Sequence, residues 1–463
     1  MTIANRLWTS ALGILLLSGA AQAQTATSSS AAPAKREVKI PIQQFKLKNG
    51  LRVVLSEDHS SPVYSICISY DVGSRDEKPG HTGFAHLFEH MMFQGSENVG
   101  KGEHFILIDI NGGDMNGTTN EDRTNYFESL PANQLDLGLF LEADRMKSLA
   151  VTQANLDNQR NAVQEERRLR VDNQPYGKTS EVVGETAYDN FGYKHPTIGS
   201  MDDLNAASLD DVKSFFKIYY APNNAALAMV GDFKTGEALA KIKQYFEDIP
   251  AQPAPARPDM TEPPQTAERR KTLEDSFAQI PRIDIEYKIP SYDSPDYMPI
   301  SVAMRILGSG QSSRLYQKLV KEKEQAASVF ANAGSRRATG LAAVIALVRP
   351  GVKMDDIEQT IYGEIAKLQS EPIADWELEK VRMRYRHDHA QQLSSSLSRA
   401  VTLAYYTVAW NDPNVINSEE ARLDAVTKED VLRVAKKYLT AENRTVVATL
   451  PRPKTAAGAA GGN

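Results

Sequence analysis

Residues 81–93 read HTGFAHLFEHMMF. Apolar residues recur within this stretch at the spacing of one helical face, which predicts an α-helix; they are Phe84, Leu87, Phe88 and Met91. Three polar residues, His86, Glu89 and His90, interrupt the apolar pattern in the order H-x-x-E-H. Residues four apart on a helix project from the same face, so His86 and His90 should lie side by side with Glu89 close to them.

Two imidazoles at this spacing can bind one metal ion. The order H-x-x-E-H is the reverse of the commoner H-E-x-x-H, and both are patterns of catalytic zinc sites. His86 and His90 would hold zinc, and Glu89 would take the proton of a water molecule. The alternative is an ordinary apolar helix that contains core histidines. We favour the metal site, because each polar group buried without a partner costs about 1–3 kcal/mol.

A second charged helix is predicted downstream, at 155–171, and it contains the sequence RNAVQEERR at 160–168. The helix around His86, this segment and the Gly/Asn-rich residues between them resemble the pitrilysin/insulinase family of zinc metallopeptidases, and within it the short processing-peptidase-like branch. The resemblance covers nearly the whole chain after the first 36 residues. It implies that Glu166 completes the site, with one Zn²⁺ per chain. Glu165 is the alternative, since adjacent residues of a helix point in different directions.

Between these two helices, residues 111–119 read NGGDMNGTT, and residues 123–130 alternate as a strand does. A polar, glycine-rich approach to an edge strand would allow an extended substrate to pair as a further strand. The resemblance implies that Asn116 and Gly117 lie in the substrate cleft and position the substrate. The alternative is a simple turn, because Asn and Gly tolerate positive φ.

The N-terminus has the features of an exported protein. Arg6 precedes an apolar run at 11–20 and the tripeptide Ala-Gln-Ala at 21–23, which predicts a signal peptide over 1–23 that is too short to span a membrane. Composition predicts a disordered lead-in at 24–36 and a disordered tail at 454–463. We therefore expect an exported protein of the bacterial periplasm, without stable membrane insertion. The net charge of −6 and the lack of a basic patch argue against a nucleic-acid partner.

Cys67 is the single cysteine, so the chain cannot form an internal disulfide bond. It lies within residues 63–70, whose alternating pattern predicts a strand. We expect Cys67 to be a small buried core residue and not a nucleophile.

The sequence also indicates two related halves. The same Asp, Val, Tyr and Asn residues recur at equal spacing in 211–229 and 430–448, and each segment reads as a helix, a break and a strand. A Pro- and Ala-rich linker at 250–272 would separate a zinc-bearing domain at 37–249 from a domain of the same fold, without the zinc motif, at 273–453.

Both halves mix strands with helices. An Asn49-Gly50 hairpin is predicted to join strands at 45–48 and 51–55, and the second half should open with strands at 276–281 and 284–289. The mixture predicts an α+β fold in which helices cover a mostly antiparallel sheet. The resemblance implies two αβ-roll domains that face each other across a cleft.

The second half departs from the family in one respect. Active members are expected to bind the substrate carbonyl with an Arg and a Tyr seven residues apart, and here these positions hold Val320 and Ala327. Neither side chain can donate a hydrogen bond to a developing oxyanion. We therefore predict that the chain is the catalytic subunit of a heterodimer, whose sister subunit lacks the zinc motif and supplies the Arg and Tyr.

These observations predict a zinc-dependent endopeptidase that hydrolyses peptides or unfolded protein segments. One alternative is a catalytically silent subunit of such an assembly, with a peptide-binding or structural role. Another is a chaperone-like module in which zinc is purely structural. The intact motif argues against both alternatives, because Glu89 has no role in a closed structural site.

Overall fold

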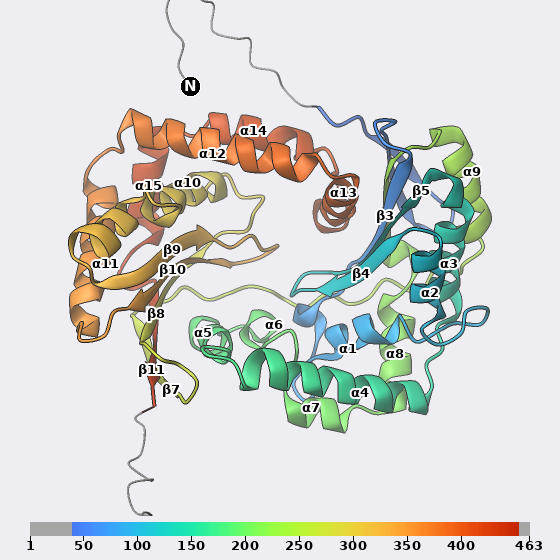
Figure 1. Ribbon diagram of the computed structural model, residues 1–463, viewed down its shortest axis with the longest axis horizontal. Helices are drawn as coiled ribbons and strands as arrows, with labels where there is room; N and C mark the ends of the chain where they lie inside the picture. Colours follow the sequence, from blue (N-terminus) through green and yellow to red (C-terminus); the bar gives the residue numbers. More distant parts are fainter. Residues whose placement is uncertain (1–38, 453–463) are drawn as a thin grey trace, which may run out of the picture. The chain divides into compact units, whose positions relative to one another are not determined.

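The computed structural model describes residues 39–452 of the chain (Figure 1). The predicted signal peptide (1–23), lead-in (24–36) and tail (454–463) therefore lie outside the described residues. Within the described part, a six-stranded and a five-stranded sheet are covered by helices. The predicted α+β fold with two helix-covered sheets is confirmed.

The first sheet has the strand order β1-β2-β6-β3-β5-β4, and only β2 and β6 pair in parallel. The predicted β1–β2 hairpin is confirmed, and Gly50 in its connection has φ +91°, a backbone conformation that glycine adopts readily. Strand β4 forms one edge of the sheet. The strands are β1 (Gln43–Lys46), β2 (Arg52–Glu57), β3 (Val63–Tyr70), β4 (Asp114–Thr119), β5 (Thr124–Pro131) and β6 (Ala225–Gly231).

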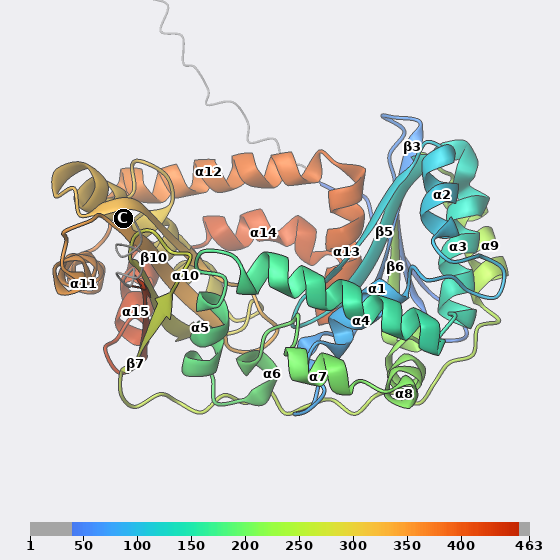
Figure 2. The same ribbon diagram turned by 60° about the horizontal axis from the view of Figure 1, so that its bottom comes forward.

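Nine helices accompany this sheet in the described first half. The predicted helix around His86 is confirmed as α1, and α4 runs beside it (Figure 2). The chain after Arg167 continues as one π-helical segment, Arg168–Asp172. The helices are α1 (Phe84–Met91), α2 (Glu103–Ile110), α3 (Leu135–Ser148), α4 (Gln153–Arg167), α5 (Thr179–Ala187), α6 (Phe191–Lys194), α7 (Met201–Ala206), α8 (Leu209–Tyr219) and α9 (Thr235–Phe246).

The second sheet has the order β7-β11-β8-β10-β9. Its strands are β7 (Arg269–Asp275), β8 (Arg282–Ile289), β9 (Ala326–Ala333), β10 (Gly340–Val348) and β11 (Arg444–Pro451). Its helices are α10 (Tyr297–Gly308), α11 (Met354–Ser370), α12 (Asp375–Leu393), α13 (Ser396–Trp410), α14 (Val415–Asp424) and α15 (Lys428–Tyr438).

The strand predicted at 276–281 is wrong. Those residues form a connection without regular structure, and the first strand of the second sheet is β7, which begins inside the predicted 250–272 linker. Strand β7 reads RRKTLED and lies mostly exposed at the edge of the sheet. Charged residues are common on edge strands because they discourage pairing with a further strand. In β7 they replace the alternating apolar residues by which a strand is recognised in a sequence.

The two halves repeat one topology, which confirms their predicted relation. Strand β6 pairs in parallel with β2 and antiparallel with β3, as β11 does with β7 and β8. Asp211 and Asp430 belong to capping boxes that begin α8 and α15. Asn224 Nδ2 donates to the carbonyl of the last residue of α8 (2.8 Å), and Asn443 Nδ2 does so at α15 (2.7 Å). The recurring residues therefore begin and end equivalent helices.

Helix α13 of the second half packs against β3 and β6 of the first sheet (Figure 1). Cys67 and Ala228 of that sheet share one apolar cluster with Leu403 of α13. This packing explains why β3 and β6 are buried on both faces. The prediction of a buried Cys67 is confirmed, and burial raises the pKa of its thiol.

Both halves also line a cavity of about 470 Å³ beside β8. Glu286 of β8 is buried at this cavity, and its Oε2 atom has no hydrogen-bond partner among the described residues. Burial and the neighbouring Asp284 raise the pKa of Glu286 to about 8, although Arg282 and Arg336 act in the opposite sense. Its surroundings therefore destabilise the charged form of the Glu286 carboxyl group relative to the neutral form.

We predict that Glu286→Gln becomes more stable relative to the unaltered protein as the pH rises from about 5 to 8. The unfolded carboxyl ionises near pH 4.5, whereas the folded one keeps its proton to about pH 8. Between these values the unfolded state binds fewer protons, so the stability of the unaltered protein falls with rising pH. Calorimetry should show a gain in Tm of at least roughly 2 °C at the upper pH. A difference in Tm between the two proteins that does not change with pH would contradict the raised pKa of Glu286.

Candidate active site

The position of α1 follows from its apolar face, which is buried in the core of the first half. Phe88 stacks on Phe215 of α8 with ring centroids 5.2 Å apart. The polar face of α1 is thereby turned toward β4 and α4, which both contact this helix. His86, Glu89 and His90 lie on this polar face of α1 and therefore project away from the core.

A buried carboxylate holds the first turn of α1. Glu77 Oε2 accepts a hydrogen bond from the backbone N–H of Gly83 (2.9 Å), and Oε1 accepts one from Ala85 (2.8 Å). His195 Nε2 lies 2.9 Å from Glu77 Oε2. A negative charge at a helix N-terminus is stabilised by the free N–H groups and the helix dipole. Sequence analysis missed both Glu77 and His195, which are brought together only by the fold.

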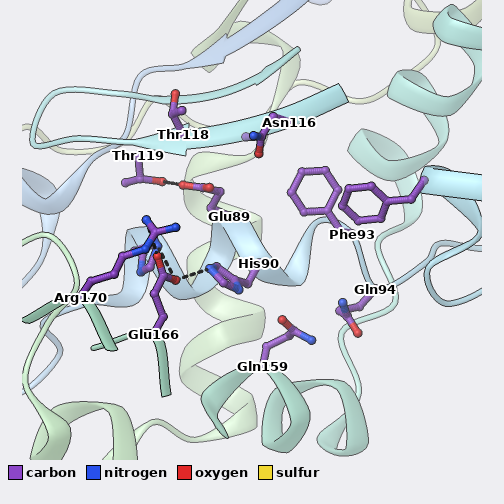
Figure 3. Close-up of a pocket in the computed structure, with 13 residues that line it drawn as sticks. Glu89, His90, Phe93, Gln94, Asn116, Thr118, Thr119, Gln159, Glu166 and Arg170 are labelled. Atoms are coloured by element: carbon purple, nitrogen blue, oxygen red, sulfur yellow. Dashed lines mark hydrogen bonds and ion pairs between the residues drawn. The ribbon is translucent and has the colours of Figure 1, made fainter. Parts of the chain in front are cut away.

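Three ligand-type atoms converge beside α1. Glu166 Oε2 lies 3.2 Å from His90 Nε2 and 3.6 Å from His86 Nε2, and Figure 3 shows the carboxylate pointing at the His90 ring. Zinc binds such atoms at 2.0–2.2 Å in tetrahedral geometry, which separates the ligand atoms by about 3.3 Å. The observed separations therefore fit one zinc ion.

The two adjacent glutamates of α4 point in different directions. Glu166 Oε1 is 2.8 Å from Arg170 Nη1, while its Oε2 meets the histidines. The Glu165 side chain is 58% exposed and accepts a hydrogen bond from Arg168 at 3.0 Å. Of the two candidates from the sequence, the structure brings only Glu166 to the histidines.

Glu89 lies next to this group and is fixed by β4. Its Oε2 accepts a hydrogen bond from Thr119 Oγ1 (2.6 Å), whereas Oε1 makes none with the described residues. Burial raises the pKa of the Glu89 carboxyl above its usual range. A Cβ at Gly117 would come within 3.0 Å of Glu89 Cγ, so glycine lets β4 approach α1 closely. Asn116 and Gly117 lie within β4, not in a turn.

One cavity of about 520 Å³ unites the residues predicted from the sequence. Its wall also contains Phe93, Phe105 and Gln159 (Figure 3 labels the first and last of these). Phe93 ends the motif stretch and could have been suspected from its position, whereas Phe105 carries no signal in the sequence. The predicted residues that line the cavity are His86, Glu89, His90, Asn116, Gly117 and Glu166.

The charges of the group suit a cation. Burial, and second the neighbouring His90, lower the pKa of His86 to about 4, so this imidazole is neutral at physiological pH. The hydrogen bond from His90 lowers the pKa of Glu166, which keeps it ionised. Metal ligands must be neutral imidazoles and ionised carboxylates, and the lowered pKa values of His86 and Glu166 both favour these forms.

A second His/Glu group among the described residues does not suit a cation. His104, Glu128 and Glu142 are all buried, but Arg145 pairs with Glu142 and already supplies a positive charge. Burial lowers the pKa of His104 to about 3. The guanidinium therefore takes the place that a metal ion would need.

The two positions at which the resemblance leads one to expect an Arg and a Tyr hold apolar side chains. Val320 packs at the margin of the second core, and Ala327 is exposed on β9. Neither position offers a hydrogen-bond donor in its side chain.

Comparison with known families identifies the chain. The family described as Insulinase (Peptidase family M16) matches residues 52–200, and the one described as Peptidase M16 inactive domain matches residues 206–385. The first match covers the half that carries the H-x-x-E-H motif, and the second begins in the related half without it. The chain belongs to peptidase family M16.

Individual relatives support this. The chain is 31% identical to the zinc protease PqqE of Helicobacter pylori over 412 residues, 88% of this chain and 93% of that protein. It is 23% identical to a probable mitochondrial-processing peptidase subunit beta of Arabidopsis thaliana, covering 85% and 75% of the two chains. The crystal structure of a protease from Helicobacter pylori has a TM-score of 0.85 at 30% identity, covering 89% of this chain and 100% of that one.

No helix within residues 39–452 combines the length and the apolar character needed to cross a membrane.

We predict that Glu77→Gln destabilises the protein and loosens the metal site. Glutamine has one side-chain oxygen, so it can accept only one of the two hydrogen bonds that Glu77 accepts. We therefore expect the free energy of unfolding to fall by about 1–3 kcal/mol. Metal affinity should fall roughly tenfold, because His86 directly follows the anchored turn. Denaturant unfolding and competition with a chelator measure the two effects.

A matched control is Glu237→Gln. Glu237 is exposed and pairs with Lys234 on the surface, so its replacement should cost less than about 1 kcal/mol. If Glu77→Gln behaved like this control in both measurements, the proposed anchoring of α1 would be wrong.

Proposed function

We propose that this chain is a zinc-dependent endopeptidase that hydrolyses peptides or unfolded protein segments. The observation that carries the proposal is the convergence of His86, His90 and Glu166 on one point beside Glu89. The relatives named zinc proteases support zinc as the metal. Three protein ligands are typical of catalytic zinc sites, which keep one position open.

His86, His90 and Glu166 would hold the metal in this proposal. Bound zinc supplies Lewis-acid chemistry, since it polarises a carbonyl group and lowers the pKa of water. The remaining chemistry belongs to the side chains of the chain itself. Thr119 fixes one oxygen of Glu89 and leaves Oε1 without a partner among the described residues.

Glu89 acts as the general base and then as the acid. Its carboxylate takes a proton from the attacking water, which forms a bond to the scissile carbonyl carbon. The same proton is then given to the leaving amine nitrogen as the C–N bond breaks. The burial that raises its pKa makes a carboxyl a better proton acceptor than one in open water.

Strand β4 provides the means of holding a substrate. Its outer edge has no partner strand within the described residues, so an extended peptide can pair with it along Asn116 and Gly117. Phe93 and Phe105, whose ring centroids are 4.8 Å apart, give the same cavity an apolar wall for a substrate side chain. Together these features position a peptide bond beside Glu89.

The proposal includes a partner and a location. Val320 and Ala327 cannot bind a developing oxyanion, so a sister subunit without the zinc motif supplies an Arg and a Tyr. One relative is itself named as a subunit, of a mitochondrial-processing peptidase. We infer from the predicted signal peptide that the mature chain is exported to the bacterial periplasm.

A catalytically silent subunit is the second candidate function. The observation that favours it is the apolar pair Val320 and Ala327, together with the match of the second half to a family described as an inactive domain. In that case the cavity beside β4 would bind peptides without cleaving them.

We predict that the purified mature chain binds one zinc ion and that Glu166→Gln removes it. The amide oxygen is a weaker ligand than the carboxylate and carries no charge. The matched control is Glu165→Gln, which changes the adjacent residue in the same way but leaves the convergent group intact. Metal analysis after dialysis should distinguish the variants. Equal zinc loss in both, or loss only in Glu165→Gln, would contradict the assignment of Glu166.

We also predict peptide hydrolysis only when the mature chain is mixed with its sister subunit, sought as the product of a neighbouring reading frame. Glu89→Gln should lower kcat by about 10²–10⁴-fold with zinc retained. Quenched fluorescent peptides provide the measurement. Full activity of the chain alone would refute the split site, and zinc binding without hydrolysis in either sample would favour the silent subunit.

A further inference from the structure

A further pocket lies on the face of the first sheet opposite to His86, His90 and Glu166. It has a volume of about 180 Å³ and shares no lining residue with the candidate active site. Asn120, Arg123 and Asn125 line it from the first half, and Tyr405, Tyr406 and Trp410 of α13 line it from the second. We call it the Arg123 pocket.

The alternation of β5 places Asn125 on this face. The next residue, Tyr126, lies under α1, with its hydroxyl 3.4 Å from the carbonyl of Phe88. Successive side chains of a strand point to opposite faces, so Asn125 faces α13, as does Phe127, which packs on the apolar cluster of that helix.

Asn125 is fully buried, and neither its Oδ1 nor its Nδ2 atom has a hydrogen-bond partner among the described residues. Each such group costs about 1–3 kcal/mol, and buried polar groups in proteins almost always have partners. An unpaired amide at the wall of a pocket therefore indicates a polar ligand within it.

Arg123 supplies a positive charge to the pocket. Its Nη1 atom donates to the carbonyl and the hydroxyl of Thr118, at 2.6 and 2.7 Å. Among the described residues, Nε and Nη2 have no hydrogen-bond partner, and no carboxylate forms an ion pair with the side chain. The neighbouring acids are engaged elsewhere, Glu121 with Arg336 (2.7 Å) and Asp122 with Arg75 (2.8 Å). Arg123 is half-buried, and burial lowers the pKa of its guanidinium.

The aromatic part of the wall and the size limit the ligand. Trp410 lies 5.3 Å from Tyr405 and 5.2 Å from Tyr406, measured between ring centroids. A volume of about 180 Å³ equals roughly six water molecules, which is the space of one amino-acid residue. A carboxylate matches the planar fork of a guanidinium and also accepts a hydrogen bond from an Asn amide, whereas a cation would be repelled by Arg123.

Strand β4 connects this pocket to the candidate active site. Residues Asn116–Thr119 line the active-site cavity, and the next residue, Asn120, lines the Arg123 pocket. A peptide paired with the edge of β4 advances about 3.3 Å per residue. A substrate residue about three to five positions from the scissile bond would therefore reach Arg123.

We propose that the Arg123 pocket binds a carboxylate of the peptide substrate, and so makes the site selective for acidic residues or for a free C-terminus near the cleaved bond. Arg123 pairs with the carboxylate, Asn125 donates a hydrogen bond to it, and the aromatic residues of α13 enclose the rest of the residue. This inference rests on the proposed function, because it assumes that β4 binds peptides.

The test is peptide binding to the zinc-loaded, full mature chain carrying Glu89→Gln, with its sister subunit. One labelled peptide sequence is used in four forms: with a free C-terminal carboxylate, with a C-terminal amide, and as the amide with either Glu or Gln at an internal position. Fluorescence anisotropy should show about tenfold tighter binding of at least one acidic form than of its neutral match. The two pairs distinguish a C-terminal from an internal carboxylate.

Variants locate the effect. In Arg123→Gln the ratio of the affinities for the acidic and the neutral peptide should fall to about one. In Asn125→Leu this ratio should fall severalfold, because Leu keeps the side-chain volume without the hydrogen-bond donor. Arg384→Gln is the matched control, since Arg384 is exposed and pairs with Asp388, and it should keep the full preference. Equal binding of the acidic and neutral peptides by the Glu89→Gln protein with an unaltered pocket would overturn the proposal. A preference for the acidic peptide that survives Arg123→Gln would show that another site binds the carboxylate.

Hydrolysis by the protein with its native Glu89 separates this inference from the proposed function. Cleavage of acidic and neutral forms with the same kcat/KM, together with equal binding, would refute the pocket and leave the peptidase standing. An acid preference in binding that depends on Arg123, without hydrolysis, would support the pocket and refute the peptidase.

Discussion

The geometry of the site depends on how α1 is fixed. Phe88 and its apolar neighbours set the rotation of the helix about its axis, because they must enter the core. The carboxylate of Glu77 sets its position along the axis by accepting hydrogen bonds from the first turn. A shift of one residue would rotate the helix by about 100° and turn His86 and His90 away from Glu166. The convergence of His86, His90 and Glu166 is therefore a consequence of these two restraints.

The duplicated fold is used for two different purposes. The first half carries the motif on α1 and has β4 at one edge of its sheet, while the second half keeps the same topology without the motif. Helix α13 of the second half covers the face of the first sheet that α1 leaves free. By doing so it completes the core around Cys67 and also builds the aromatic wall of the Arg123 pocket. The second half thus shapes the first without supplying a ligand to the metal-ligand group.

Much of this could be predicted from the sequence where the signal is local. The helix at α1, the hairpin at Gly50 and the helix–strand repeat at 211–229 all follow from short-range patterns. Strand β7 could not, because its charged edge lacks alternation. The Glu77–His195 contact joins residues 118 positions apart, and the unpaired amide of Asn125 has meaning only once α13 is in place. Resemblance pointed to Glu166, but only the geometry separates it from Glu165.

The central claim is that one metal ion binds between α1 and α4. The most direct measurement is a crystal structure of the zinc-loaded mature chain with anomalous diffraction data at the zinc edge. The account predicts a single peak within about 2.0–2.2 Å of His86 Nε2, His90 Nε2 and a Glu166 oxygen. A peak at the buried group of His104, Glu128 and Glu142, or none beside α1, would contradict it.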